Sequence, residues 1–421
     1  MNRKLILSSL FIFFCLWNIQ AEEYETMSPN GMLKIKLRID KGTTYEIWHG
    51  NEQLIASSPI GLNLSNGMII GGGTVKNVTR NVVDQTIEVI AGKNKTLREA
   101  YNELLISFTE DYDLLVRAYD EGIAYRFITR LGGEIIINSE DAVFNFTFTP
   151  TVYFPECDTN YSGEKDQEGK VHQIHQGYRN FERLYKIYNA PTEITNNRFS
   201  VSPVLFSHPD TSYKIVVTES DTYDYPGLYM EQNGPNSMRG KWAQYPKEVM
   251  DEDPSNPNYW YSNHLVISRE NYIAKTEGNR TFPWRVIIVS DDDKSLLNNE
   301  LVYMLAEPCR LTDTSWIQPG KSAWEWWHKA VLEGVDFPSG NNNLSFQLYK
   351  YYVDWASQHG IEYMTLDAGW SESYIRTLCL YAKQKNVKII VWTWASCVRE
   401  NPEDWIKKMK DYGVSGAKID F

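Results

Sequence analysis

The stretch Gly413-Val-Ser-Gly-Ala-Lys-Ile-Asp-Phe421 is a small-residue turn followed by a short apolar run that ends on Asp420. In a parallel α/β sheet, residues at the carboxyl end of a strand face the ligand side, so an Asp there is placed to do chemistry. The stretch therefore predicts a strand over 416–421 and makes Asp420 the first candidate for a reactive group.

The sequence from 311 onward repeats this arrangement upstream of Asp420. Short apolar runs that indicate strands alternate with helical spacing of apolar residues, and one helix opens with a proline. The alternation predicts the first half of a (β/α)₈ TIM barrel. A doubly wound sheet is the alternative, but no GxGxxG motif follows the first strand. Strands are expected at 323–327, 362–367, 387–394 and 416–421, and helices at 345–358, 374–384 and 402–412.

A complete barrel of this kind takes about 250 residues, more than the segment 311–421 supplies. The sequence thus predicts a C-terminally truncated catalytic barrel that comprises strands 1 to 4. The last of these strands would leave an exposed sheet edge, which favours aggregation.

The residues before the barrel have a different texture. Between 22 and 310, short β-type runs alternate with turns rich in Asn, Gly and Asp, which indicates a large N-terminal β-sandwich domain. A polar stretch over 156–179 predicts a long loop, and such loops tend to be functional. The clearest strand patterns lie at 33–39, 104–108, 113–119, 123–128, 213–218 and 284–290.

Residues 1–21 are typical of a signal peptide: a positive start, an apolar run over 5–17 and a small residue, Ala21, at the cleavage end. We therefore expect secretion across the inner membrane, most simply to the periplasm. No later apolar run is long enough to span a membrane. The net charge of −12 argues against nucleic acid as a partner, because phosphate binding needs a basic surface.

The cysteines give no metal or redox motif. Four of the five lie beyond the signal peptide, far apart and without CxxC spacing. Buried free thiols are expected, with one disulfide as the alternative. The four are Cys157, Cys309, Cys379 and Cys397.

Polar and aromatic residues gather at the predicted carboxyl ends of the four barrel strands. Carboxylates ringed by tryptophans suit glycoside hydrolysis, in which one carboxylate attacks C1 or activates water and another protonates the leaving oxygen. Taken singly, each residue also has a structural interpretation, since a strand-end Asp often caps a helix. No HExxH, GxSxG or Walker motif competes with this chemistry. The set comprises Trp324, Glu325, Trp326, Trp327, His328, Asp367, Gly369, Trp370, Trp392, Thr393, Trp394, Lys418 and Asp420.

Several motifs in order along the chain resemble glycoside hydrolase family 97. Each is weak alone, but their order is specific. The resemblance implies an N-terminal β-supersandwich, a central (β/α)₈ barrel and a C-terminal β-domain. The motifs are Val116-Arg-Ala-Tyr-Asp-Glu-Gly-Ile-Ala-Tyr-Arg-Phe127, Glu219-Ser-Asp-Thr-Tyr-Asp-Tyr-Pro226, Pro283-Trp-Arg-Val-Ile-Ile-Val-Ser-Asp291, Glu307-Pro-Cys309, Trp324-Glu-Trp-Trp327, Gly334-Val-Asp-Phe337, Leu366-Asp-Ala-Gly-Trp370 and Lys418-Ile-Asp420.

Two positions relate the sequence to one branch of that family. Inverting α-glucosidase members have a base Glu at the end of the third barrel strand, where this sequence has Thr393, and a Gly where it has Asp420. The sequence is thus similar to the retaining branch, typified by α-galactosidases, with Asp420 as nucleophile. Retention needs two carboxyl groups about 5–5.5 Å apart, without room for an intervening water. Lys418, on the same strand, would favour the charged form of Asp420.

The resemblance also implies groups outside this barrel half. The acid/base Glu and most calcium-binding Glu residues would lie beyond Phe421, so the 421 residues alone are expected to be inactive. Glu182 matches one calcium ligand after a one-residue shift, and Glu325 stands where an Asp is expected. The alternatives are an inverting α-glucosidase, or an inactive fragment that only binds carbohydrate weakly through its β-sandwich. An oligosaccharide or glycoside substrate would meet Trp324, Glu325, Trp327, Asp367, Trp370, Trp392 and Lys418.

Overall fold

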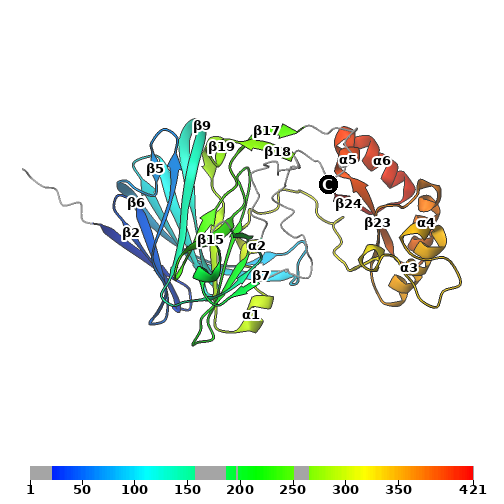
Figure 1. The fold of residues 1–421 in the computed structure, drawn as a ribbon, viewed down its shortest axis with the longest axis horizontal. Coiled ribbons are helices and arrows are strands. Elements are labelled where there is room, and N and C mark those ends of the chain that lie inside the picture. Colours follow the sequence, from blue (N-terminus) through cyan, green and yellow to red (C-terminus); the bar gives the residue numbers. More distant parts are fainter. Residues whose placement is uncertain (1–20, 157–185, 196–197, 251–264, 421) are drawn as a thin grey trace, which may run out of the picture. The chain divides into compact units, whose positions relative to one another are not determined.

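The computed structural model describes residues 21–156, 186–195, 198–250 and 265–420. The predicted signal peptide up to residue 20, nearly all of the predicted polar loop, Cys157 and Glu182 lie outside these residues. The chain divides into two compact units (Figure 1). The first covers 1–88, 96–249 and 265–309, and the second covers 310–421 with 89–95 and 250–264.

The first unit is built almost entirely of antiparallel strands, which confirms the β-rich prediction. Its central strand is β9 (Gly122–Phe146), which pairs with β4, β8, β16, β19 and β20. The strands of the main sheet are β1 (Glu22–Met27), β2 (Leu33–Ile39), β3 (Thr43–His49), β4 (Glu52–Leu64), β5 (Ile69–Ile70), β6 (Val75–Glu88), β7 (Thr96–Phe108), β8 (Tyr112–Tyr119), β9, β10 (Thr151–Phe154), β11 (Lys186–Tyr188), β12 (Phe199–Val201), β13 (Val204–Ser207), β14 (Lys214–Ser220), β15 (Tyr229–Gly234), β16 (Ser237–Lys241), β19 (Ala274–Thr281) and β20 (Trp284–Ser290); β17 (Pro246–Met250) and β18 (Leu265–Arg269) form a separate pair.

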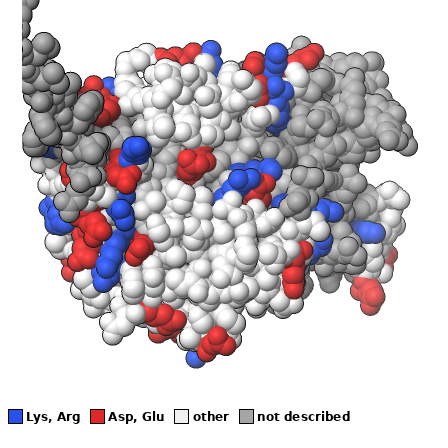
Figure 2. All heavy atoms as spheres, turned by 60° about the vertical axis from the view of Figure 1, so that its left-hand side comes forward, with Lys and Arg blue, Asp and Glu red and all other residues white. Residues whose placement is uncertain are grey.

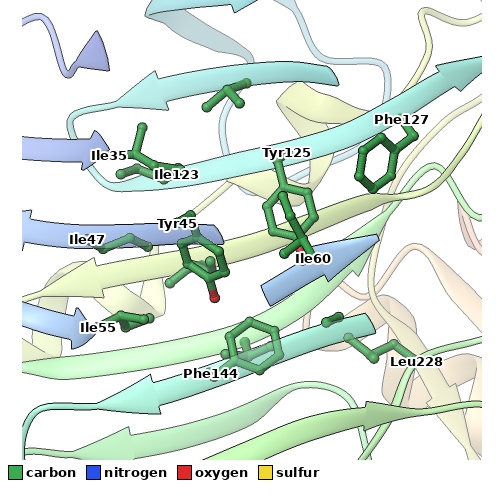
Figure 3. Packing of buried hydrophobic residues seen from close by; sticks show 14 of the residues in the cluster. Ile35, Tyr45, Ile47, Ile55, Ile60, Ile123, Tyr125, Phe127, Phe144 and Leu228 are labelled. Atoms are coloured by element: carbon green, nitrogen blue, oxygen red, sulfur yellow. The ribbon is translucent and has the colours of Figure 1, made fainter. Parts of the chain in front are cut away.

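Alternation along the strands explains the core of this unit. In β2 every second side chain is buried, as expected when one face of a strand packs inward and the other meets solvent. Isoleucines and aromatic residues from β2, β3, β4 and β9 point into a shared interior (Figure 3). On the face drawn in Figure 2, uncharged side chains cover a wide area, and acidic and basic side chains lie next to one another at its sides and in its middle.

Two short helices follow β20, α1 (Asp293–Leu297) and α2 (Leu301–Leu305). The Asp292 side chain accepts a hydrogen bond from the Lys294 N–H and so caps α1. Leu301, Met304 and Leu305 of α2 pack with Trp284 of β20 in a small second cluster of the first unit.

The second unit contains a four-stranded parallel sheet with helices between its strands. The sheet runs in chain order, β21 (Ser322–Trp324), β22 (Tyr363–Leu366), β23 (Lys388–Trp394) and β24 (Gly416–Asp420). Because the strands are parallel and in register, their carboxyl ends lie at one edge. The helices are α3 (Phe346–Gln358), α4 (Glu372–Gln384), α5 (Ala395–Glu400) and α6 (Pro402–Tyr412).

Local sequence explains where these helices begin and end. Ser345 and Asn401 cap α3 and α6 by accepting hydrogen bonds from the Leu348 and Asp404 backbone N–H groups. Gly413 ends α6 in the left-handed conformation, at φ 88°, which costs a glycine little. The predicted helix over 402–412 is confirmed, and the other two begin or end within two residues of their predicted bounds.

The prediction of a strand over 323–327 is wrong in its second half. β21 ends at Trp324, and residues Glu325–His328 form a 3₁₀ turn that Lys329 closes in the left-handed conformation. The turn directs the Glu325 side chain to hydrogen-bond partners in the interior and leaves Trp327 75% exposed. The short helix α5 was not predicted.

Two other predictions concern the state of the cysteines and the presence of membrane-spanning helices. Within the described residues, Cys309, Cys379 and Cys397 are free thiols, but only Cys379 of the three is buried, so the expectation of burial is wrong for Cys309 and Cys397. The described helices include none that combines the length and apolar character needed to cross a bilayer.

Candidate active site

The carboxyl edge of the parallel sheet holds one lysine between two carboxylates. Lys418 Nζ lies 2.8 Å from Asp367 Oδ2 and 3.3 Å from Asp420 Oδ2. Lys418 and Asp420 are two residues apart on β24, so their side chains project from the same face of the sheet. Asp367 follows directly after β22 and reaches the same lysine from two strands away.

Indole N–H groups complete the surroundings of the two carboxylates. Trp324 Nε1 donates to Asp367 Oδ2 at 2.7 Å, and Trp392 Nε1 donates to Asp420 Oδ2 at 3.2 Å. Trp370 Nε1 in turn donates to the Trp392 carbonyl at 2.8 Å. One network therefore joins the four strand ends, and its hydrogen bonds to the carboxylates are charge-assisted, which makes them stronger than neutral ones.

The two carboxylates differ in exposure. The Asp367 side chain is 7% exposed, and its Oδ1 accepts a hydrogen bond from the Ala368 N–H at 2.8 Å. The Asp420 side chain is 36% exposed. An incoming ligand can therefore reach Asp420 more readily than Asp367.

Lys418 remains positively charged in this setting. Burial opposes its charge, but the hydrogen bond to Asp367 and the charges of Asp367 and Asp420 outweigh burial and raise the pKa of Lys418. Its ammonium group also lies 4.7 Å from the centre of the Trp324 ring, a cation–π contact. The lysine thus balances both carboxylates without titrating near neutral pH.

Glu325 is the most buried acid of the group, at 1% exposure. Its Oε1 accepts hydrogen bonds from the Asp367 N–H at 2.8 Å and from the Tyr349 hydroxyl at 3.0 Å. Burial raises the pKa of Glu325 by more than these two hydrogen bonds lower it, so the net shift is upward. Glu325 is thus linked to the network through the backbone of Asp367.

Aromatic rings line the same edge. The Trp324 and Trp326 rings stack, with centroids 5.2 Å apart, and the Trp327 centroid lies 6.1 Å from that of Trp324. Next to them is a cavity of about 220 Å³. Flat indole faces can pack on the C–H faces of a sugar ring. The cavity is lined by Glu325, Trp326, Asn341, Leu344, Asp367 and Ala368.

Eight described residues were expected to meet the substrate or to act as nucleophile. The structure links seven of them by hydrogen bonds or ion pairs: Trp324, Glu325, Asp367, Trp370, Trp392, Lys418 and Asp420. Trp327 joins them only through its ring contact with Trp324. Sequence reasoning missed Tyr349, whose position on α3 carries only the ordinary signal of a buried helix face. Asn341 also lines the cavity, and it was not singled out from the sequence.

The described part of the site does not contain a calcium cluster. Across the described residues, no three His, Cys, Asp or Glu side chains gather in a way that could hold a metal ion. Calcium takes six or more oxygen ligands, so the single expected ligand Glu182, which the structure does not describe, is no substitute for such a group.

Chemically, the edge presents an accessible carboxylate beside a fixed positive charge and aromatic rings. Such a carboxylate can attack an electrophilic carbon as a nucleophile or accept a proton as a base. Thr393, at the end of the neighbouring strand β23, offers no second carboxylate. Asp420 is thus the group best placed to meet a ligand.

Comparison with known proteins identifies relatives along nearly the whole chain. Residues 26–308 match the family model "Glycosyl-hydrolase 97 N-terminal", and residues 326–421 match "Glycoside hydrolase 97". A retaining alpha-galactosidase from Bacteroides thetaiotaomicron is 33% identical over 98% of this chain and 62% of its own length. A probable retaining alpha-galactosidase from Streptomyces bingchenggensis is 26% identical over 92% of this chain and 55% of its own length.

Solved structures agree at the level of the fold. A single-residue variant of a glycoside hydrolase family 97 enzyme from Pseudoalteromonas sp. strain K8 superposes with a TM-score of 0.71 at 18% identity. The match covers 94% of this chain and 59% of that one. The chain thus spans about three fifths of the length of the relatives that it matches.

Proposed function

Because the chain belongs to glycoside hydrolase family 97, we propose that the protein hydrolyses terminal α-glycosidic bonds with retention of configuration, and that its substrate is an α-galactoside. The observation that carries this proposal is the partly exposed Asp420, held at a strand end beside Lys418 and the Trp392 indole. The names of the two curated relatives point to the same reaction.

In the proposed reaction, Asp420 attacks C1 of the sugar as the bond from C1 to the aglycone oxygen breaks. That oxygen takes its proton from the acid/base Glu, which is proposed on the family resemblance alone. This attack forms a covalent glycosyl-enzyme, which water then hydrolyses with a second inversion at C1. Lys418 and the Trp392 N–H hold the carboxylate in place before attack. Both of these groups contact Oδ2, so they also set the orientation of the carboxylate.

The sugar would be held by the groups around Asp420. Asp367 and Lys418 offer an acceptor and a donor for ring hydroxyls, and Trp324 and Trp327 offer apolar faces. Trp370 and Trp392 support this subsite, Trp370 through the Trp392 backbone and Trp392 through Asp420. This assignment keeps Asp420 as the one described carboxylate that reacts.

The proposal extends to the fold and to groups that the described residues do not supply. We take the first unit as a β-supersandwich and the four parallel strands as the first four of a (β/α)₈ barrel. The acid/base Glu, and calcium with Glu182 among its ligands, are proposed on the family resemblance alone. Secretion to the periplasm is proposed on the sequence of residues 1–21 alone.

The runner-up within this chemistry is an inverting α-glucosidase. It would need a carboxylate base to activate water, and Thr393 stands where that branch has its Glu. A third interpretation is that the 421 residues by themselves bind carbohydrate weakly and catalyse nothing. Turnover of an aryl α-galactoside by the 421-residue chain would refute that interpretation.

The proposal is tested on the protein expressed from its complete reading frame. Aryl α-galactoside, α-glucoside and β-arabinopyranoside are compared as substrates, each with and without a chelator. Proton NMR then follows the first anomer released from the best substrate. We expect preference for the α-galactoside and release of the α-anomer first. Release of the β-anomer from an α-galactoside would refute retention. A preference for the α-glucoside would refute the assignment of an α-galactoside as the substrate.

A further inference from the structure

Glu325 is a buried carboxyl group to which the proposed reaction gives no step. It lies in the 3₁₀ turn directly after β21, at 1% exposure. A buried acid needs hydrogen-bond partners, because an unpaired charge in the interior is costly. The identity of its partners therefore indicates what the residue does.

Both partners of Glu325 meet the same oxygen. Oε1 accepts from the Asp367 N–H at 2.8 Å and from the Tyr349 hydroxyl at 3.0 Å. Tyr349 belongs to α3 and is fully buried. Burial and the neighbouring Glu325 carboxylate raise the pKa of Tyr349, so its hydroxyl stays a donor. Helix α3 thus holds the glutamate, and the glutamate holds the backbone of Asp367.

That backbone position carries one carboxylate of the site. Asp367 is the first residue after β22, and its N–H donates to Glu325 rather than to a neighbouring strand. Its carboxylate binds Lys418 at 2.8 Å, and Lys418 binds Asp420 at 3.3 Å. A shift of the Asp367 backbone would therefore move Lys418 and change the setting of Asp420.

We propose that Glu325 is a positioning residue: its Oε1 fixes the Asp367 N–H and thereby the Asp367–Lys418–Asp420 constellation, and it takes no part in the reaction itself. The catalytic part of this inference rests on the proposed function, whereas the structural part does not. What matters in Glu325 is then the reach and the acceptor oxygen of its side chain, not its negative charge.

The second oxygen of Glu325 allows the length of the side chain and its charge to be tested separately. Oε2 is buried and has no hydrogen-bond partner among the described residues. A glutamine keeps an acceptor oxygen at the position of Oε1 and replaces only Oε2 with an amide NH₂. An aspartate keeps the charge but is one methylene shorter. Glu325→Gln and Glu325→Asp are therefore a matched pair that removes one property each.

The first readout is hydrogen–deuterium exchange of the peptide that contains residue 367, measured on the 421-residue chain. We expect Glu325→Asp to speed exchange of the Asp367 amide about tenfold or more, because the N–H loses its acceptor. Glu325→Gln should leave this exchange unchanged. Tyr349→Phe is the control, since it removes the other donor and leaves the Asp367 bond in place.

The second readout is the kinetics of the same variants in the protein from the complete reading frame. A misplacement of about 1 Å can cost about a hundredfold in rate, so Glu325→Asp should lower kcat by about ten- to a hundredfold. Glu325→Gln, which keeps the acceptor oxygen, should lose less of kcat than Glu325→Asp, so the ratio of the two losses is the readout.

Three results would overturn the inference. One is unchanged Asp367 exchange in Glu325→Asp. The second is exchange in Glu325→Gln as fast as in Glu325→Asp. The third is a larger loss of kcat in Glu325→Gln than in Glu325→Asp without any change in exchange, which would make Glu325 a group that acts on substrate. Exchange does not depend on turnover, so it decides the positioning role even if the proposed reaction is wrong.

Discussion

Each of the two units holds one cation between two carboxylates, but in different settings. In the first unit, Arg285 of β20 binds Glu140 of β9 through two hydrogen bonds of 2.6 and 2.8 Å, and Glu219 of β14 through one of 2.8 Å. In the second unit, Lys418 binds Asp367 and Asp420. The same charges thus occur in the middle of an antiparallel sheet and at the carboxyl edge of a parallel one.

The arginine cluster is buried and its oxygens are occupied. Arg285 is 2% exposed, the Tyr225 hydroxyl donates to Glu140 at 2.9 Å, and the Leu228 N–H donates to Glu219 at 2.7 Å. The lysine cluster instead ends in the partly exposed Asp420. Saturated partners suit a structural role, whereas an accessible carboxylate can meet a ligand. The comparison teaches that surroundings, rather than charge pattern, separate a structural cluster from a reactive one.

The largest expected effect distinguishes the clusters by activity. Asp420→Ala in the protein from the complete reading frame should lower kcat by roughly 10³-fold or more, as removal of a covalent nucleophile does. Its stability should change by less than about 0.5 kcal/mol, because the side chain is partly exposed. Azide should restore part of the activity by attacking C1 in the vacated space. If Asp420→Ala keeps activity close to that of the parent, the lysine cluster is not reactive and does not differ from the arginine cluster in function.

The next effect is on stability. Arg285→Met leaves Glu140 and Glu219 buried without their cation, which should lower the free energy of unfolding by about 3–5 kcal/mol. Urea denaturation of the 421-residue chain measures this loss. Adding Glu140→Gln and Glu219→Gln to the same chain is the control and should recover part of the stability. A loss below about 1 kcal/mol for Arg285→Met would contradict the structural role.

Lys418→Met tests the cation of the second cluster. Without it the two carboxylates face each other unbalanced, and we expect kcat/KM to fall by about ten- to a hundredfold through misplacement of Asp420. Lys408→Met is the matched control, since Lys408 pairs with Glu372 rather than with Asp367 or Asp420. Equal losses in both variants would show that Lys418 acts on stability alone.

The smallest effect concerns a third kind of ion pair, between Asp113 and the partly exposed Arg130, which meet through two hydrogen bonds, one of 2.7 Å. Burial works against the Asp113 charge, but the hydrogen bonds from Arg130 and Ser107 and the charge of Arg130 lower the pKa of Asp113. A lowered pKa stabilises the fold above the ordinary pKa of about 4, and this stabilisation is lost as pH falls through the folded value.

Asp113→Asn should therefore cost stability at pH 7, by about 1 kcal/mol or less, and flatten the loss of stability below about pH 4. Thermal melts from neutral to acid pH check this. Parallel melting curves for parent and variant across that range would show that the pair contributes nothing pH-dependent.

Much of the fold followed from local patterns. The strand 33–39 and the strand 284–290 were predicted with their observed bounds, because the alternation of the first and the continuous apolar run of the second are local signals. The run 323–327 was predicted as one strand and is not, because the long-range bonds of Glu325 to Tyr349 and Asp367 override strand propensity. Such contacts are set by tertiary structure.

The candidate site was predicted as a set but not in its connections. Strand ends at one edge of a parallel sheet follow from topology, which brought Asp367, Lys418 and Asp420 together. That Lys418 bridges both carboxylates depends on side-chain geometry across three strands. The supporting role of Tyr349 could not be read from its helix pattern, which is that of any buried residue.

The central claim is that Asp420 forms a covalent bond to the sugar. Its most direct test is to incubate the protein from the complete reading frame with a ring-fluorinated galactosyl fluoride, whose fluorine slows hydrolysis of the intermediate. Peptide mapping by mass spectrometry then locates the label. We predict one fluorogalactosyl group on Asp420 in the parent and none in Asp420→Asn. A label on another carboxylate, or turnover of this reagent without any trapped adduct, would contradict the account.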